Sequence, residues 1–396
     1  MTHKRNIFFF LVVASILVTT YLVIKIAKGY KLDLENMSFQ PTGLLVATSN
    51  PDGAKIWING LLKGATNSTI SLTPREYKVE IKKAGYLPWS KTLKLEKELV
   101  VQTNALLFPI LPDLKALTFN GAEKPVISPD LSKVVYQTTT KPAGIWVLDL
   151  NDFPFGINRE SRQIFVGSLR GRDLTAASYQ WTPDSKQILL TFTTGKIKEN
   201  FSLDSNTLTD EIALKDISQD LFSLNLQWTS EQKIRKDQQM EKLVPELADI
   251  IENKTRDLSF SPDETKILYT ATASAQIPDN LIPAINGAST QKQERTIKPD
   301  HTYVYDIKED KNFPLALSLS RPFTLSWFPT SRHLILVEKN KVTIMEYDGT
   351  NQTVVYNTPF VDLNAFSFPS GNRLLVLTTI SSNPKAPANL YAVSLK

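Results

Sequence analysis

Residues 259–271 read SFSPDETKILYTA, a short apolar strand, a Ser-Pro-Asp turn, a basic residue and a second apolar strand. The turn has a physical basis, since proline fits position i+1 of a type I turn and a neighbouring Asp or Ser can bond the local backbone amides. Four further copies read VISPDLSKVVYQT (126–138), QWTPDSKQILLTF (180–192), SWFPTSRHLILVE (326–338) and SFPSGNRLLVLTT (367–379), the last two being weaker. Partner strands are expected after each copy, at 145–150, 200–203, 302–307, 342–347 and 389–395. Residues 114–396 are therefore predicted to form a repeated, all-β array.

The spacing of the copies bears on how many units the array holds. The turn prolines stand at positions 129, 183, 262, 329 and 369, which gives intervals of 54, 79, 67 and 40 residues. A four-stranded propeller blade needs about 40 residues, so the long intervals hold insertions or a missed copy. Gln227-Trp228-Thr229-Ser230 echoes Gln180-Trp181-Thr182-Pro183, although its continuation is helical. It is either an interrupted blade or a strand that leads into an insertion. We expect about six blades, with five or seven as alternatives.

The repeat resembles the TolB-type, WD-repeat-like β-propellers, which are built on a Ser-Pro-Asp-Gly signature. In this chain Leu131, Ser185 and Glu264 take the place of the Gly, and two copies also lose the Asp, at Thr330 and beside Gly371. The resemblance implies a TolB-like propeller at 114–396 and an extracytoplasmic location. It implies little about activity, because propellers host many unrelated functions.

An apolar segment lies close to the N-terminus. Ile7 to Ile24 reads IFFFLVVASILVTTYLVI without a charge, and a helix of this length spans about 27 Å, near the hydrocarbon thickness of a bilayer. The alternative is a cleaved signal peptide, but the run passes into Lys25 without a small-x-small cleavage site. We expect an uncleaved transmembrane helix at 7–24, a cytoplasmic N-terminus at 1–6 and a polar tether at 25–42.

The orientation of this helix does not follow from charge alone. Lys4, Arg5 and the α-amino group precede it, and Lys25, Lys28 and Lys31 follow it, so the positive-inside count is nearly balanced. The expectation that the C-terminal domains lie outside the cytoplasm rests on the family resemblances.

Residues 43–108 are expected to form a small β domain. Asn50-Pro51-Asp52-Gly53 reads as a turn, and Asn59-Gly60 is a strong hairpin signal. The expected strands are 45–48, 55–58, 76–82, 92–95 and 99–103.

This stretch resembles the PEGA domain, named for its Pro-Glu-Gly-Ala turn. The matching residues are Pro51-Asp52-Gly53-Ala54, Ile58-Asn59-Gly60, Gly64, Leu72-Thr73-Pro74, Tyr77-Lys78-Val79 and Ala84-Gly85-Tyr86. Asp52 stands where the name has Glu, and Arg75 stands where the family usually has Gly. The resemblance implies a surface-associated β-sandwich module, without catalytic residues to carry over.

Two insertions interrupt the propeller repeat. Residues 231–254 place apolar side chains at helical spacing, and Pro245 predicts either a kink or a helix that starts there. The apolar positions are Met240, Leu243, Val244, Leu247, Ile250 and Ile251. Residues 274–300 show no periodicity and are expected to form a loop insertion. Each insertion could cap a propeller face or meet a partner, or it could simply pack at the rim.

Composition excludes several classes of function. The net charge is +5, but residues 1–35 hold five basic and two acidic residues, so the other 361 residues carry only +2. Nucleic acid is therefore not an expected partner. Cysteine is absent, and the three histidines (His3, His301 and His333) form no i,i+4 pair, so no metal site or other cofactor is expected.

The sequence contains no recognisable catalytic motif. Neither a Gly-x-Ser-x-Gly elbow, a Walker loop nor a Gly-x-Gly-x-x-Gly fingerprint occurs. Asp130, Asp184 and Asp263 recur once per copy and are interpreted as turn-formers. The recurring basic residues are interpreted as solvated turn positions; they are Lys133, Lys186, Lys266, Arg332 and Arg373. No catalytic, cofactor-binding or metal residue is predicted.

Two hypotheses of function follow. The first is a non-enzymatic, single-pass membrane protein of the cell envelope, whose propeller presents a face to an envelope protein or glycan. The second is an extracytoplasmic hydrolase or lyase whose site lies at the mouth of the propeller channel. An acidic cluster or a metal at that mouth would favour the enzyme, and an apolar or mixed shallow face would favour binding.

Overall fold

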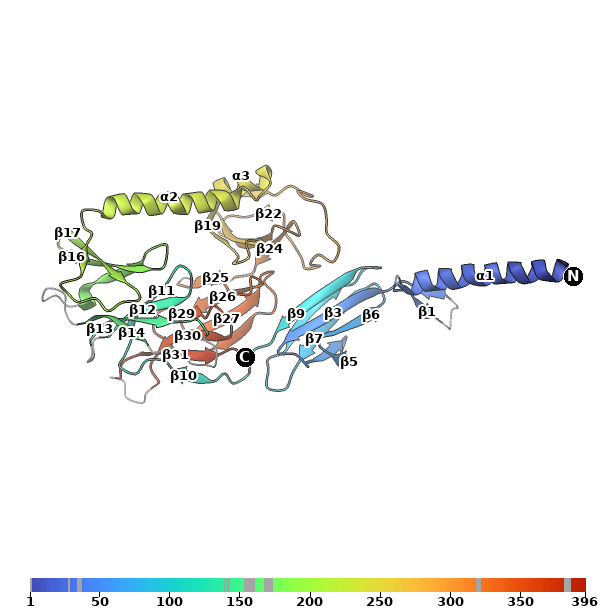
Figure 1. Ribbon diagram of the computed structural model, residues 1–396, viewed down its shortest axis with the longest axis horizontal. Helices are drawn as coiled ribbons and strands as arrows, with labels where there is room; N and C mark the ends of the chain where they lie inside the picture. The colour runs from blue at the N-terminus through green and yellow to red at the C-terminus, as the bar shows by residue number, and fades with distance from the viewer. Residues whose placement is uncertain are drawn as a thin grey trace. The chain divides into compact units, whose positions relative to one another are not determined.

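The computed structural model describes residues 2–27, 29–33, 38–138, 140, 143–152, 161–166, 174–317, 322–380 and 386–396. The chain forms two compact units (Figure 1). Unit 1 comprises Met1–Ile110, Ile282–Gln293 and Lys308–Asp310. Unit 2 comprises Leu111–Leu281, Glu294–Ile307 and Lys311–Lys396.

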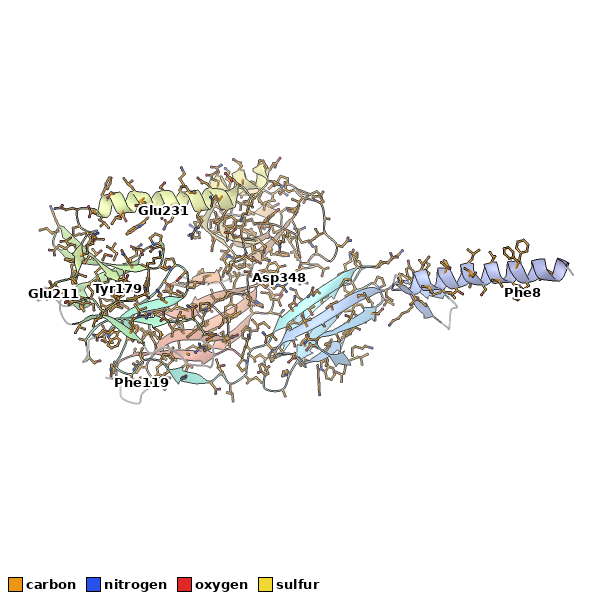
Figure 2. All side chains as sticks on the ribbon, viewed as in Figure 1. Phe8, Phe119, Tyr179, Glu211, Glu231 and Asp348 are labelled. Atoms are coloured by element: carbon orange, nitrogen blue, oxygen red, sulfur yellow. The ribbon has the colours of Figure 1, made fainter. Side chains whose placement is uncertain are left out.

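Helix α1 (Thr2–Ala27) opens unit 1. Its stretch Ile7–Ala27 is long and apolar enough to cross a membrane, and Phe8 projects from it 69% exposed (Figure 2). Such a helix is compatible with a membrane anchor or with a signal sequence. The helix ends at Gly29, whose φ of +83° lets the Gly29 and Tyr30 amides bond the carbonyls of the last turn.

The expected tether at 25–42 contains regular structure. Strand β1 (Lys31–Asp33) pairs antiparallel with β2 (Ser38–Gln40). Lys28 and residues 34–37 of that tether lie outside the described residues.

The next seven strands form a sandwich of two sheets, ordered β6-β3-β9 and β5-β4-β7-β8. The strands are β3 (Gly43–Asn50), β4 (Lys55–Ile58), β5 (Leu61–Ala65), β6 (Ser68–Leu72), β7 (Glu76–Lys82), β8 (Trp89–Lys94) and β9 (Val100–Leu106). Alternate side chains such as Ile56, Val79 and Ile81 are fully buried between the sheets. The sequence patterns missed β5 and β6, although the hairpin at Asn59-Gly60 that leads into β5 has the expected positive φ at both residues.

The middle of the 274–300 insertion belongs to unit 1. The Lys94 amide of β8 donates to Thr290 Oγ1 (3.2 Å), and Gln291 Nε2 donates to the Thr92 carbonyl (2.8 Å). Gly287 has a φ of +76°, and a Cβ there would stand 2.4 Å from the Val100 carbonyl oxygen, so this close approach requires glycine. In unit 2, the ends of the insertion pair as β21 (Ala275–Gln276) and β22 (Thr296–Ile297).

Unit 2 contains five four-stranded antiparallel sheets in the part of the chain that is described, and we number these blades 1 to 5. Blade 1 is β11 (Glu123–Ile127), β12 (Lys133–Thr138), β13 (Gly144–Asp149) and β14 (Arg162–Val166). Blade 2 is β15 (Ser178–Trp181), β16 (Gln187–Thr194), β17 (Ile197–Asp204) and β18 (Lys215–Asp216). Blade 3 is β19 (Thr255–Phe260), β20 (Lys266–Ala271), β23 (Thr302–Asp306) and β24 (Lys311–Leu315). Blade 4 is β25 (Thr324–Trp327), β26 (His333–Glu338), β27 (Lys341–Glu346) and β28 (Thr353–Tyr356).

Blade 5 joins the two ends of the propeller. It is ordered β10 (Leu114–Ala116), β31 (Asn389–Ser394), β30 (Arg373–Thr378) and β29 (Ala365–Ser367), so its outer strand comes from the start of unit 2 (Figure 1). Thr118 extends this contact, since its Oγ1 donates to Asn389 Oδ1 (3.0 Å) and accepts from the Leu390 amide (2.8 Å). The strand that closes the ring removes one open sheet edge.

The described residues form five blades, which was the lower alternative to the expected six. Gln227-Trp228-Thr229-Ser230, the candidate for a further blade, lies inside helix α2 (Leu221–Met240). Ser230 stands where the other copies have a helix-breaking proline, and the residues that follow it are mostly good helix formers, so the segment continues as a helix. A second helix, α3 (Pro245–Lys254), starts at Pro245, as one of the two alternatives predicted.

Helix α3 covers the face of blade 3 that does not pack on blade 4. Tyr269 and Tyr303 of blade 3 are fully buried in one core with Leu247 and Ile251 of α3. The other face of blade 3 shares a core with Trp327 of blade 4. Helix α2 has no buried residue, and Glu231 is exposed on it (Figure 2). The helical insertion therefore supplies the packing surface that a neighbouring blade would otherwise provide.

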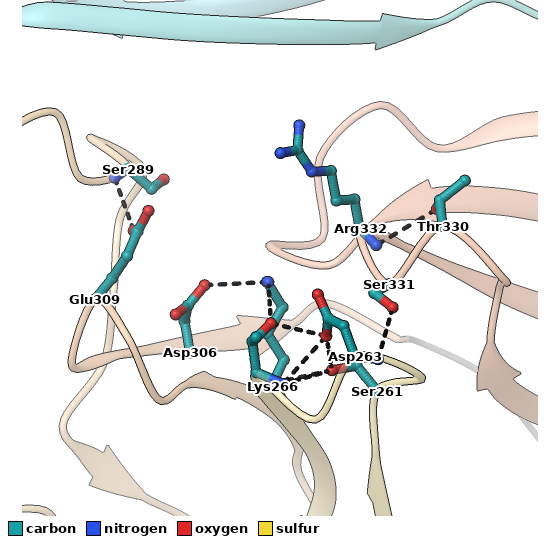
Figure 3. Close-up of polar contacts among 10 residues, drawn as sticks. Ser261, Asp263, Lys266, Ser289, Asp306, Glu309, Thr330, Ser331 and Arg332 are labelled. Atoms are coloured by element: carbon teal, nitrogen blue, oxygen red, sulfur yellow. Dashed lines mark hydrogen bonds and ion pairs between the residues drawn. The ribbon is translucent and has the colours of Figure 1, made fainter.

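The Asp residues of the repeated turns do form the turns. Asp263 Oδ1 accepts from Ser261 Oγ (2.7 Å) and from the Thr265 amide (3.1 Å), and its own amide donates to Ser331 Oγ of blade 4 (3.0 Å; Figure 3). Asp130 and Asp184 make the same contacts within their turns. Burial raises the pKa of the Asp263 carboxyl, but these hydrogen bonds outweigh burial and hold the pKa below its usual value.

The interpretation of the recurring basic residues was wrong for Lys266. Lys186 and Arg332 are exposed as expected, Lys133 and Arg373 are half-buried, and Lys266 is only 8% exposed. Its Nζ lies 3.5 Å from Asp306 Oδ2 (Figure 3) and 4.8 Å from the centroid of the Tyr347 ring of blade 4. Strand position alone does not explain this difference, because Gln187, the first residue of β16, is exposed. Lys266 lies inward because Asp306 and the Tyr347 ring both interact favourably with its charge.

Truncation tests the closing strand. We expect a fragment that lacks residues 1–113 to unfold cooperatively and to stay soluble, because it keeps β10. A fragment that lacks residues 1–121 exposes the edge of β31, and we expect a lower melting temperature and aggregation. Both fragments lack the sandwich strands, so the difference between their melting curves and light scattering reports the closing strand alone. Identical behaviour would show that β10 does not hold the ring closed.

Substitution tests the buried ion pair. We expect Asp306→Ala to lower the free energy of unfolding by about 3–5 kcal/mol, since it leaves the Lys266 charge buried without its partner. The control Lys186→Ala removes an exposed charge and should change it by about 0.5 kcal/mol at most. The double variant Lys266→Met/Asp306→Leu should recover most of the loss, as measured by chemical denaturation. An Asp306→Ala loss no larger than that of the control would contradict the pair's role.

Candidate functional site

The first strands of the blades place small polar side chains on one side and large apolar ones on the other. In β15, Ser178 and Gln180 are exposed while Tyr179 and Trp181 are buried. In β25, Thr324 and Ser326 are exposed while Trp327 is buried. These strands are edge strands of their sheets, so each blade presents a row of small polar side chains along that edge.

Strand β19 departs from this regular pattern. Its pairing with β20 passes from Arg256 opposite Thr270 to Ser259 opposite Leu268, which leaves a bulge at Asp257 and Leu258. Asp257 has a φ of +56°, in the left-handed region that non-glycine residues rarely adopt. A bulge turns side chains out of the regular alternation, and here it leaves Arg256 and Asp257 both exposed.

Two pockets flank this bulge, and both include Arg256 and Asp257. The larger, which we call the β19–β25 pocket, has a volume of about 630 Å³. Its lining residues are Arg256, Asp257, Leu268, Thr270, Asp300, His301, Thr302, Leu317, Phe323, Thr324 and Leu325. The smaller has a volume of about 520 Å³ and lies between α2, the end of α3 and β19, with Arg235, Lys236 and Glu252 among its lining residues.

Arg256 of the β19–β25 pocket lies beside two carboxylates. Its Nη2 lies 2.9 Å from Asp300 Oδ1, and its Nε lies 3.6 Å from Asp257 Oδ2. Beside it, His301 Nδ1 lies 2.9 Å from the Pro299 carbonyl oxygen, and the imidazole stacks on Tyr303 with ring centroids 6.5 Å apart. The pocket thus offers a guanidinium, two carboxylates, an imidazole and threonine hydroxyls beside the apolar surface of Phe323 and three leucines.

The remaining sequence candidates do not join this site. His333 is 6% exposed and its Nδ1 lies 2.8 Å from Thr330 Oγ1, so it supports a turn of blade 4. The side chain of His3 lies outside the described residues. Within the described ranges, no three His, Asp or Glu side chains come together as they would to hold a metal ion. The sequence analysis missed Arg256 and Asp257, because only a pairing register reveals a bulge.

Comparison with known proteins identifies the sandwich. The PEGA domain family matches residues 42–109, close to the range 43–108 expected from the resemblance. A comparison with curated protein sequences found no match.

Solved structures similar to the chain include propeller proteins. A putative TolB from Agrobacterium tumefaciens is 12% identical over 71% of this chain and 83% of that one, with a TM-score of 0.24. TolB from Acinetobacter baumannii is 15% identical over 81% of this chain and 62% of that one, with a TM-score of 0.23. An oligogalacturonate lyase in complex with manganese is 9% identical over 81% and 83% of the two chains, with a TM-score of 0.25. At these identities the likeness concerns the fold alone. The chain therefore carries a PEGA domain at residues 42–109, followed by a β-propeller that has TolB proteins among its structural neighbours.

Proposed function

We propose that this chain is a non-enzymatic, single-pass membrane protein of the cell envelope, whose propeller binds a glycan outside the cytoplasm. Helix α1 supports the anchor, because its apolar stretch Ile7–Ala27 is long enough to span a bilayer and is not buried against the rest of the chain. Along the chain, the PEGA domain follows the helix and the propeller follows the PEGA domain. The observation that carries the proposal is the β19–β25 pocket.

The size of the pocket favours a small, polar ligand over a folded partner. A volume of about 630 Å³ lies within the range of small-molecule sites, whereas a stable protein interface buries about 800 Å² on each partner. One or two sugar rings would fill such a space.

The chemistry of the lining also fits a sugar. A sugar ring carries hydroxyl groups that donate and accept hydrogen bonds, and its C–H groups form apolar patches. Arg256 donates, Asp257 and Asp300 accept, and Thr302 and Thr324 do both. Phe323 offers an apolar ring surface on the same pocket wall as Leu325. The lining mixes positive and negative groups, so it favours a neutral glycan over a strongly charged one.

Binding by variants of the full-length protein tests this site. We expect the detergent-solubilised chain to bind members of a panel of neutral oligosaccharides, and we expect Arg256→Ala to weaken that binding by tenfold or more in calorimetry. The reason is that hydrogen bonds to a charged group contribute about 1.5–3 kcal/mol. Arg332→Ala removes an exposed arginine outside the pocket, so it is the matched control and should bind as the wild type does.

Three outcomes would count against the proposal. They are failure to bind any oligosaccharide, equal loss in Arg256→Ala and Arg332→Ala, and capture of protein ligands alone. Release of hydrolysis or elimination products from a bound glycan would show instead that the propeller is a hydrolase or lyase. Thermal melting of both variants separates loss of a contact from loss of the fold.

The anchor has its own test. We expect the mature protein to keep its N-terminus and to resist extraction from membranes by alkaline carbonate, because an uncleaved helix stays in the bilayer. Protease added to intact cells should then remove the bulk of the chain. Extraction by carbonate together with a shortened N-terminus would show that α1 is a signal sequence, and protection of the propeller would show the reverse topology.

A further inference from the structure

Unit 1 contains a pocket whose charged lining residues, within the described part of the chain, are all basic. It has a volume of about 320 Å³ and lies at the ends of strands β4 to β7 and against β1. Its lining residues are Lys31, Gln40, Thr42, Ile58, Asn59, Leu61, Lys63, Ser71, Leu72, Thr73, Arg75 and Tyr77. We call it the basic pocket. Three cations with uncharged polar groups between them form a receptor for an anion such as a phosphate.

The cations of the basic pocket are supported by specific contacts. The Arg75 guanidinium carbon lies 4.8 Å from the centroid of the Tyr77 ring, and the Tyr77 hydroxyl donates to the Thr73 carbonyl (3.0 Å). Lys31 Nζ donates to the Ser71 carbonyl (3.2 Å). Stacking on an aromatic ring orients the planar guanidinium and leaves its N–H groups at the edge, where they can bind an anion.

The chain places this pocket close to the membrane. Lys31 follows the last residue of α1 by only four residues, so it lies within about 14 Å of the helix end. In the same stretch, Lys25 Nζ lies 4.1 Å from the centroid of the Tyr30 ring and 5.7 Å from that of Tyr21. Tyrosine and lysine are the residues that concentrate where a helix leaves the hydrocarbon core, so these contacts mark the headgroup region.

An exposed leucine lies beside the cations of the basic pocket. Leu61 lines the pocket and is 62% exposed. It belongs to β5, an edge strand whose residues are all exposed. An exposed leucine beside lysine and arginine is a combination that suits the boundary between headgroups and acyl chains.

We propose that the basic pocket binds the phosphate-bearing headgroup of an anionic phospholipid and so seats the PEGA domain on the membrane from which α1 emerges. Free inorganic phosphate carries the same kind of charge as a phospholipid headgroup. It has no acyl chain to contact the exposed Leu61, and its binding would not depend on how close the pocket lies to the end of α1. This proposal rests on the membrane anchor and is independent of what the propeller binds.

Native mass spectrometry of the full-length chain in a neutral detergent tests the site, with phosphatidylglycerol and phosphatidylcholine titrated separately. Each cation near an anionic membrane surface contributes roughly fivefold in affinity. We expect Lys63→Gln or Arg75→Gln to weaken phosphatidylglycerol binding about fivefold, and the double variant to weaken it about 30-fold. Phosphatidylcholine binding should stay the same. The matched control is Lys55→Gln/Lys94→Gln, which removes two exposed lysines of the same sandwich outside the pocket.

Two further measurements distinguish binding of the lipid headgroup from binding of a free anion and from a general effect of surface charge. Inorganic phosphate at millimolar concentration should displace little phosphatidylglycerol. If phosphate alone binds as tightly as the lipid and needs Arg75, the site is a free-anion site and the lipid assignment is wrong. An equal loss in the control variant would overturn the proposal in favour of diffuse surface charge. Because these lysines and Arg75 are exposed, unchanged melting temperatures are expected and would exclude misfolding.

Discussion

The antiparallel pairing of β10 with β31 is the contact on which the propeller depends. Strand β10 completes blade 5, and blade 5 in turn shares a core with blade 1, so this pairing links the last strands of the propeller to its first blade. Here residues 114–116 and Thr118 make that join over a sequence separation of more than 250 residues. Ordering such a distant pair carries a large loss of chain entropy, and the cores between blades compensate for it only once the ring is closed.

One position in the ring is filled by helices, and the candidate site lies next to it. Blade 3 packs on blade 4 through one face and on α3 through the other. Its first strand, β19, directly follows α3 without a loop and carries the bulge at Asp257. A regular β19 would present Asp257 and Ser259 in the alternation seen in β15 and β25. The bulge adds Arg256 to the exposed side, and two pockets form around it.

The net positive charge of this protein is concentrated towards its N-terminus. Residues 1–35 hold +3 of the net charge of +5, and the basic pocket adds Lys63 and Arg75 to Lys31 from that segment. The β19–β25 pocket mixes cations and anions instead. The two pockets therefore suit different ligands, an anionic one at the PEGA domain and a polar, neutral one on the propeller. The difference between the two pockets follows from the charged residues that line each of them, and the net charge of the chain does not reveal it.

The amino-acid sequence by itself determined the local features. The apolar run at 7–24 predicted the helix, the Asn59-Gly60 hairpin and the Ser-Pro-Asp turns predicted reversals that the structure has, and Pro245 marked the start of α3. The sequence patterns did not predict strands β5 and β6. The residues of β5 (LLKGA) are all exposed and those of β6 (STISL) are only partly buried, so neither strand has a strong apolar alternation.

Only the tertiary structure decided the number of blades, the burial of Lys266 and the site. The sequence at residues 227–230 resembles a blade strand, but it forms part of helix α2. This outcome depends on the helix-forming residues that follow it and on the packing of blade 3 against α3. The burial of Lys266 depends on Asp306 and on Tyr347 of the next blade, which motif spacing does not show. Arg256, Asp300 and Thr324 come from three separate segments, and the pairing of distant strands brings them together. Sequence patterns report contacts between near neighbours in the chain, whereas register and ring closure depend on the free energy of the whole assembled array.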